Sequence, residues 1–217
     1  MPRSPENTWT PVALSRDIPA GTAAPGHSGG RDLAIWRSAS GRIAAWDDRC
    51  PHRGMRLSHG FVRGEALSCI YHGWSYDQAG RCRRIPAHPE LAPPDTICVP
   101  GFAAAESAGV IWVADGPQAS GPVPGFPGLT ALRVLEFRAG PDAVAAHLGQ
   151  AGGRVLRLAL AGQDCLLLVQ SRSGGACSGV YLLVPEGIGA PQRKALSRAA
   201  ETLRRACEAA TATGVST

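Results

Sequence analysis

The sequence predicts a mainly β N-terminal domain followed by a small α+β domain that ends in a helix. Two observations lead to this fold class. Gly (27) and Pro (18) are abundant among the 217 residues, and this composition favours loop-rich β structure over a helical bundle. No long helical period occurs before residue 116, whereas apolar residues recur at helical spacing after Pro191. The length itself suits one or two small domains.

The N-terminal part consists of short apolar runs separated by turn signals. The predicted strands are residues 33–37, 42–46, 61–62, 66–69, 74–77 and 110–113. Ser40-Gly41 separates the first two runs and predicts a hairpin, and Arg63-Gly64-Glu65 separates the next two in the same way.

A Pro/Gly-rich segment divides this part from the rest of the chain. We therefore expect a first domain at residues 1–116, a linker at 117–128 and a small α+β domain at 129–217. Within the last domain, the predicted strands are residues 131–137, 155–160, 165–170 and 180–184, and a short helix is expected at 142–150. Pro191 suits the first turn of the C-terminal helix. The apolar positions of that helix are Leu196, Ala199, Ala200, Leu203, Cys207 and Ala210.

The composition argues against several classes of function. The net charge is +5, but the arginines are scattered and form no basic stripe interleaved with aromatic residues, so we do not expect nucleic-acid binding. No apolar run approaches the roughly 18 residues that a membrane span needs. The N-terminus MPRSPENTWTPV lacks the apolar core of a signal peptide. We therefore expect a cytoplasmic protein without a membrane segment.

The seven cysteines do not suggest a disulfide scaffold, because their spacing is irregular and cytoplasmic thiols stay reduced. Metal binding by some of them is the leading interpretation. The others are expected to be ordinary buried or half-buried thiols; these are Cys82, Cys98, Cys165, Cys177 and Cys207.

The stretch DRCPHRGMRLSHGFVRGEALSCIYHGWSYDQAGRC, residues 48–82, contains the most informative motif. Cys50-x-His52 is followed after sixteen residues by Cys69-x2-His72, so two loops each offer one thiolate and one imidazole. A binuclear iron–sulfur centre needs two protein ligands for each iron, and we assign both cysteines to one iron and both histidines to the other. Spacing alone leaves a tetrahedral zinc site open, because Cys2His2 is also a zinc ligand set.

The surroundings of the two loops favour the iron–sulfur centre. Gly54 and Gly73 stand close after ligands, where the backbone turns tightly and offers N–H groups to sulfide. Tyr71 and Trp74 can shield a redox centre from water. Zinc fingers usually pair like ligands, whereas each loop here mixes Cys with His.

The two loops closely resemble the cluster loops of the Rieske non-heme iron oxygenases, which include ring-hydroxylating dioxygenases and vanillate O-demethylase-like monooxygenases. The resemblance rests on Cys50-Pro51-His52-Arg53-Gly54 and on the run from Cys69 to Asp77, and it covers roughly the first half of the chain. It implies an antiparallel β sandwich with a cluster-binding subdomain. It also implies a Rieske-type [2Fe-2S] cluster held by Cys50, His52, Cys69 and His72.

Three positions separate the chain from the respiratory Rieske proteins, which carry an extra cysteine in each loop and a serine beside a cluster sulfur. Met55 and Tyr71 stand at the cysteine positions, so the respiratory disulfide cannot form, and Trp74 stands at the serine position. Fewer hydrogen bonds to sulfur stabilise the reduced cluster less. We therefore expect a potential in the lower part of the Rieske range.

A complete oxygenase of this family also has a mononuclear iron held by two His and one carboxylate. After His88 the chain has a single histidine, His147, so two histidines are not available there. Residues 129–217 resemble the closing strands and terminal helix of that catalytic domain. We expect no catalytic residue in this chain.

The resemblance implies that the chain works with partners. We expect it to pass single electrons from a reductase, which must bind the nucleotide or flavin, to a mononuclear-iron oxygenase subunit, within an oligomer. Two alternatives stay open: a subunit of a hetero-oligomeric Rieske oxygenase, and a non-catalytic redox-sensing Rieske protein.

Several polar residues near the loops have ordinary interpretations. Asp47, Asp48 and Asp77 are expected to be solvated turn residues, with docking or hydrogen bonding around the cluster as the alternative. His59 is expected to form hydrogen bonds within its loop rather than to bind metal.

Overall fold

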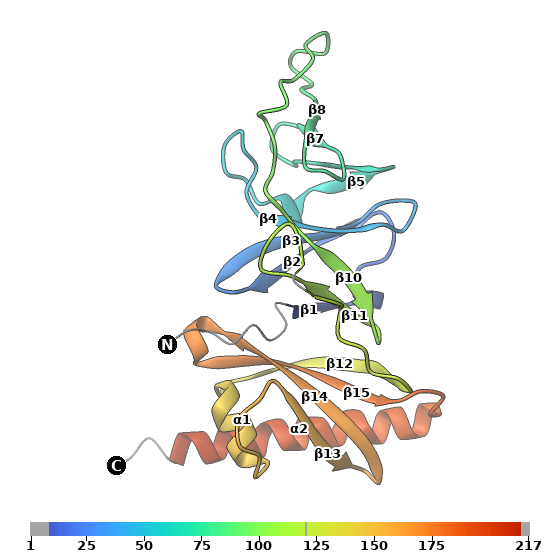
Figure 1. The fold of residues 1–217 in the computed structure, drawn as a ribbon, viewed down its shortest axis with the longest axis vertical. Helices are drawn as coiled ribbons and strands as arrows, with labels where there is room; N and C mark the ends of the chain where they lie inside the picture. Colours follow the sequence, from blue (N-terminus) through green and yellow to red (C-terminus); the bar gives the residue numbers. More distant parts are fainter. Residues whose placement is uncertain (1–8, 120, 214–217) are drawn as a thin grey trace. The chain divides into compact units, whose positions relative to one another are not determined.

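The structure is a computed structural model that describes residues 9–119 and 121–213, and it divides into two compact units (Figure 1). The first unit runs to Glu106 and includes Ile111–Pro124, and the second consists of Ser107–Val110 and the residues from Gly125 onward. The first is built of β-sheets, and the second combines one antiparallel sheet with a C-terminal helix. The predicted fold class is therefore confirmed.

Three sheets build the first unit. The sheet β2–β3–β4–β9 consists of Thr22–Ser28, Arg31–Arg37, Ile43–Asp47 and Gly101–Phe102. The sheet β1–β11–β10 consists of Thr10–Leu14, Val110–Val113 and Ala104–Ser107. The sheet β5–β6–β7–β8 consists of Phe61–Arg63, Ala66–Ser68, Ser75–Tyr76 and Cys82–Arg84. Short 3-10 turns lie at Ser15–Asp17 (η1) and Leu57–His59 (η2).

The predicted hairpin around Ser40-Gly41 is present as β3 and β4. Its register places Trp36 opposite Ala44 and Trp46 opposite Ala34, so each large ring faces a small side chain. The two indoles meet edge to face with centroids 4.9 Å apart, an arrangement that aromatic pairs prefer. Both tryptophans are buried, and they anchor the strand that leads into the first cysteine–histidine motif.

The two cysteine–histidine motifs are connected to this core. One hydrophobic cluster joins Trp36 and Trp46 to Leu57, Leu67 and Tyr76 and also contains Cys50 and Cys69. Burial of apolar side chains stabilises by about 25 cal/mol per Å². The two thiols are therefore held by the same packing that holds the sheets.

The second unit is one antiparallel sheet covered by helices (Figure 1). Its strands, in the order β12–β15–β14–β13, are Leu129–Phe137, Cys177–Pro185, Gln163–Arg172 and Val155–Leu160. Helix α1 spans Pro141–His147, three residues shorter than expected at its C-terminal end, and α2 spans Ala190–Thr213. Leu196, Ala200 and Cys207 of α2 are buried in the hydrophobic core of this unit, as their helical spacing predicts. Neither helix is long and apolar enough to cross a bilayer.

Candidate functional site

The first loop, residues 48–56, connects β4 to η2 and closes on itself through its backbone. The N–H of Cys50 donates to the carbonyl oxygen of Met55 at 2.8 Å, and the N–H of Gly54 donates to the carbonyl oxygen of Cys50 at 2.8 Å. Gly54 has a φ of +69°. This left-handed conformation is unfavourable for any residue that carries a Cβ atom. His52 lies inside this closed turn, two residues after the cysteine.

The second loop, residues 69–74, connects β6 to β7 and repeats the same closure. The N–H of Cys69 donates to the carbonyl oxygen of Trp74 at 2.9 Å, and the N–H of Gly73 donates to that of Cys69 at 3.0 Å. Gly73 has a φ of +71°. In both loops the glycine follows the cysteine by four residues, so the shared pattern is set by that spacing. His72 stands three residues after its cysteine rather than two.

The two thiols are buried and close to each other. Cys50 is 3% exposed and Cys69 is 2% exposed. Burial raises the pKa of the Cys69 thiol; the backbone N–H of Tyr71 opposes this effect, and the neighbouring Cys50 adds to it. Since a thiol must lose its proton to bind metal, cluster assembly at this pair releases protons.

Tyr76 of β7 reaches the same pair. Its hydroxyl oxygen lies 3.1 Å from Sγ of Cys50, and the side chain is fully buried. Burial and the contact with Cys50 raise the pKa of the Tyr76 hydroxyl, so it stays protonated and can donate to a thiolate. Trp74 thus stands where the respiratory proteins carry a serine, but the hydroxyl of Tyr76 is placed to donate a hydrogen bond to the sulfur of Cys50.

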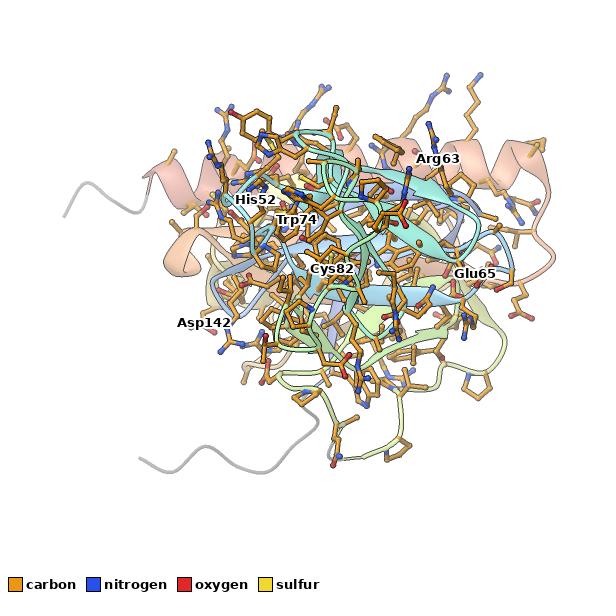
Figure 2. All side chains as sticks on the ribbon, turned by 90° about the horizontal axis from the view of Figure 1, so that it is seen from above. His52, Arg63, Glu65, Trp74, Cys82 and Asp142 are labelled. Atoms are coloured by element: carbon orange, nitrogen blue, oxygen red, sulfur yellow. The ribbon has the colours of Figure 1, made fainter. Side chains whose placement is uncertain are left out.

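The two imidazoles lie side by side, with ring centroids 4.6 Å apart. The indole of Trp74 stacks on His52 at 4.3 Å with the planes 4° apart, and Figure 2 shows these two side chains close together. Tyr71 stacks on His72 at 3.8 Å. Partial burial lowers the pKa of His52, and the charges of His72 and Arg53 lower it further, which favours the neutral form that binds metal.

The four predicted ligands are therefore brought together as a thiol pair and an imidazole pair. Among the described residues, no three His, Cys, Asp or Glu side chains converge in the way that a single metal ion requires. A tetrahedral zinc site needs four donors around one point. A [2Fe-2S] centre takes only two protein ligands on each iron, and the donor pairs fit this division.

Asp48 is not a solvated turn residue, contrary to expectation. Its side chain is fully buried, and its carboxylate accepts hydrogen bonds from the backbone N–H and the Oγ hydroxyl of Ser58, both at 2.7 Å. Arg56 lies 3.4 Å from the Asp48 carboxylate and 2.8 Å from the carboxylate of Asp32 in β3. Nδ1 of His27 lies 3.6 Å from the second carboxylate oxygen of Asp32. The only feature of the sequence that pointed to Asp48 is its position two residues before Cys50.

The remaining aspartate, histidines and cysteines that the sequence pointed to belong neither to the thiol pair nor to the imidazole pair. Asp77 accepts hydrogen bonds from the backbone of Ala79 and Arg81 and pairs with Arg83, as a turn residue does. Besides His72, the exposed histidines of the described residues are His59, His88 and His147. Cys82, Cys165 and Cys207 are buried and Cys177 is half-buried, as expected, whereas Cys98 is exposed and contradicts the expectation for it.

Comparisons with known proteins identify a domain of known type in the N-terminal part of the chain. The family described as "Rieske [2Fe-2S] domain" matches residues 8–100. The oxidoreductase NdmD of Pseudomonas putida is 40% identical over 118 residues, which are 54% of this chain and 20% of the relative. The 4beta-methylsterol monooxygenase of Methylococcus capsulatus is 40% identical over 115 residues, 50% of this chain and 31% of the relative. The chain thus spans about a fifth to a third of the length of these relatives.

Solved structures resemble the fold over both units. The structure of dicamba monooxygenase bound to dicamba has a TM-score of 0.70 at 18% identity, with 97% of this chain and 91% of that chain covered. NdmB of Pseudomonas putida CBB5 has a TM-score of 0.70 at 17% identity, with 92% and 81% covered. At this identity the likeness concerns the fold. Residues 8–100 are a Rieske [2Fe-2S] domain with a [2Fe-2S] cluster as its cofactor, and this domain makes the chain a relative of the Rieske oxygenases.

Proposed function

We propose that Cys50 and Cys69 bind one iron of the cluster, that His52 and His72 bind the other, and that the chain passes single electrons between partner proteins. The pairing of the donors supports the ligand assignment, because the thiols are buried together and the imidazoles lie 4.6 Å apart. When bound, a Rieske cluster takes up and releases one electron at a potential set by its ligands and surroundings.

The observation that carries the electron-transfer proposal is the difference in exposure between the two donor pairs. The thiols are nearly inaccessible, whereas His72 is exposed and is flanked by Tyr71 and Ile70, which are 54% and 56% exposed. The imidazole side thus offers a partner protein a short approach to the redox centre. The buried thiol side, covered by Tyr76, keeps water away from the sulfur atoms.

The electrons are proposed to leave the chain for a mononuclear-iron oxygenase centre in a partner. Within the described residues no group of three donor side chains could hold such an iron, and His147 is exposed at the end of α1. A reductase is the proposed donor. Relatives of the domain include proteins named as the oxygenase subunits of 3-chlorobenzoate-3,4-dioxygenase and phthalate 4,5-dioxygenase, which supports a place in an oxygenase system. We also propose a cytoplasmic location.

A second candidate is a subunit of a hetero-oligomeric Rieske oxygenase. The observation that favours it is the fold likeness to monooxygenase chains, which runs through the second unit as well as the first. A transient complex with an iron-bearing partner would favour the carrier, and a stable stoichiometric complex would favour the subunit.

The proposal is tested with the purified, cluster-loaded chain. Anaerobic titration should show uptake of one electron per cluster, and the isolated chain with a reductase and oxygen should oxidise no substrate. Turnover by the isolated chain would refute the carrier function. His72→Ala removes one of the four donors and should abolish electron delivery to a reconstituted partner, and full delivery by that variant would refute the ligand assignment.

A further inference from the structure

A charged network leads from the protein surface to the first loop. Its inner member is Asp48, which has no exposed surface and whose carboxylate accepts hydrogen bonds from Ser58 and Arg56. Its outer member is Asp32, whose side chain is 44% exposed and lies 2.8 Å from Arg56. Arg56 is therefore shared between two carboxylates, one buried and one at the surface.

The network is fixed to the loop that carries Cys50 at both ends of that loop. Asp48 precedes Cys50 by two residues, and Arg56 directly follows Met55, whose carbonyl oxygen accepts the hydrogen bond from the N–H of Cys50. The N–H of Asp48 also donates to the carbonyl oxygen of Asp32 at 3.1 Å. These bonds hold the three charges at set positions relative to the thiol of Cys50.

We propose that Asp48, Arg56 and Asp32 set the reduction potential of the cluster, with Arg56 as the balancing charge. Reduction adds negative charge to the cluster, so a fixed negative charge nearby disfavours it and a fixed positive charge favours it. Two carboxylates and one guanidinium leave one excess negative charge. The network as a whole therefore keeps the potential lower than an uncharged environment would. The inference rests on a cluster in these loops and does not require the carrier function.

A charge mechanism predicts opposite shifts for two variants of one ion pair. Arg56→Gln removes the positive charge, so the ratio of reduced to oxidised cluster at a fixed applied potential should fall by about three- to tenfold. Asp32→Asn removes a negative charge, so the same ratio should rise. We expect a smaller rise of about threefold, because solvent screens the half-exposed Asp32. A network that acts only by supporting the loop would give shifts of the same sign, since both variants break the same pair.

The experiment is a spectroelectrochemical titration of the full cluster-loaded chain and its variants, after iron content and the visible spectrum have established equal loading. Arg56→Lys keeps the charge and should restore a ratio close to that of the unaltered protein. Arg42→Gln is the matched control, because Arg42 pairs with Glu65 at 3.0 Å beside the opposite end of β4. It should leave the ratio unchanged.

Shifts of the same sign for Arg56→Gln and Asp32→Asn would overturn the proposal, and so would shifts no larger than that of the control. If Arg56→Gln retains no cluster, Asp32→Asn and Arg56→Lys decide the question alone: an unchanged ratio in Asp32→Asn or a large change in Arg56→Lys contradicts the proposal. Absence of a cluster from every form would instead count against the proposed ligands.

Discussion

The first and second loops close their backbones in the same way, but different interactions hold them from outside. In each, a cysteine N–H bonds to the carbonyl five residues on, and a glycine at positive φ returns to the cysteine carbonyl. The first loop is supported by the buried carboxylate of Asp48 and the guanidinium of Arg56. The second loop instead contributes aromatic rings: Tyr71 stacks on His72 of the same loop, and Trp74 stacks on His52 of the first loop. Tyr76, in β7 just after the second loop, reaches Sγ of Cys50 in the first.

This difference separates two tasks. The closed backbone turn depends on the spacing of Cys and Gly and places the donors, so it is the same in both loops. The outer support determines how the centre behaves once formed: fixed charges flank the first loop, whereas the second loop and β7 supply the aromatic cover and the hydroxyl beside the sulfur of Cys50. The following predictions test whether the loops are equivalent in the first respect and different in the second.

The largest effect is expected where the loops are equivalent. Cys50→Ala and Cys69→Ala each remove one of two thiolates from the same iron, so both variants should lose the cluster altogether. Iron content and the visible spectrum measure the loss. Cys98→Ala, which removes an exposed thiol, is the control and should retain full loading. Full loading of either loop variant would show that the proposed ligands are wrong.

The next effect tests the buried support of the first loop. Asp48→Ala leaves the Ser58 donors and Arg56 without their buried acceptor, and we expect a loss of about 3 kcal/mol in the free energy of unfolding. Asp77→Ala, in a more exposed turn, should cost about 1 kcal/mol. Urea unfolding of the two variants provides the measurement. Equal losses would contradict a special contribution of the buried carboxylate to the first loop.

The two loop glycines provide a smaller contrast. Alanine at either position must adopt a positive φ, at a cost of about 1–2 kcal/mol. A Cβ at Gly73 would lie 3.0 Å from Cγ of Pro86, whereas nothing lies within 4 Å of one at Gly54. Gly73→Ala should therefore destabilise more than Gly54→Ala in thermal unfolding. The reverse order would mean that the surroundings of the second loop are not as tight as the structure describes.

The smallest effect concerns the hydrogen bond to sulfur. Tyr76→Phe removes the hydroxyl 3.1 Å from Sγ of Cys50, which should cost the reduced cluster about 1 kcal/mol and lower the midpoint potential by roughly 40 mV. Tyr71→Phe keeps its ring on His72 and serves as the control. A potentiometric titration in which both variants match the unaltered protein would exclude this hydrogen bond as a determinant of the potential.

Much of the fold could be predicted because the apolar runs and turns are local signals. The β3–β4 hairpin follows from two apolar runs around Ser40-Gly41, and α2 follows from its apolar spacing. Strand β2 was missed, because TAAPGHS contains few strand-forming residues. β2 is an edge strand, where Pro25 is tolerated although it has no N–H to donate. The pairing of β2 with β3 compensates for the weak strand preference of these residues.

The candidate site divides in the same way. The ligand positions could be predicted because Cys and His at short spacing carry their chemistry in the sequence. The support of the first loop could not, because Asp48 and Arg56 lie eight residues apart within that loop and their partner Asp32 comes from β3, so the three charges meet only when β3 packs beside the loop. The contact of Tyr76 with Cys50 joins residues 26 positions apart and has no local signal either.

The central claim is that two thiols and two imidazoles hold one binuclear cluster, and the metal content of the purified chain tests it most directly. Iron, acid-labile sulfide and zinc should be determined on the same sample, against protein concentration from amino-acid analysis. The account predicts two iron atoms and two sulfides per chain, without zinc. One zinc per chain and no sulfide would contradict it.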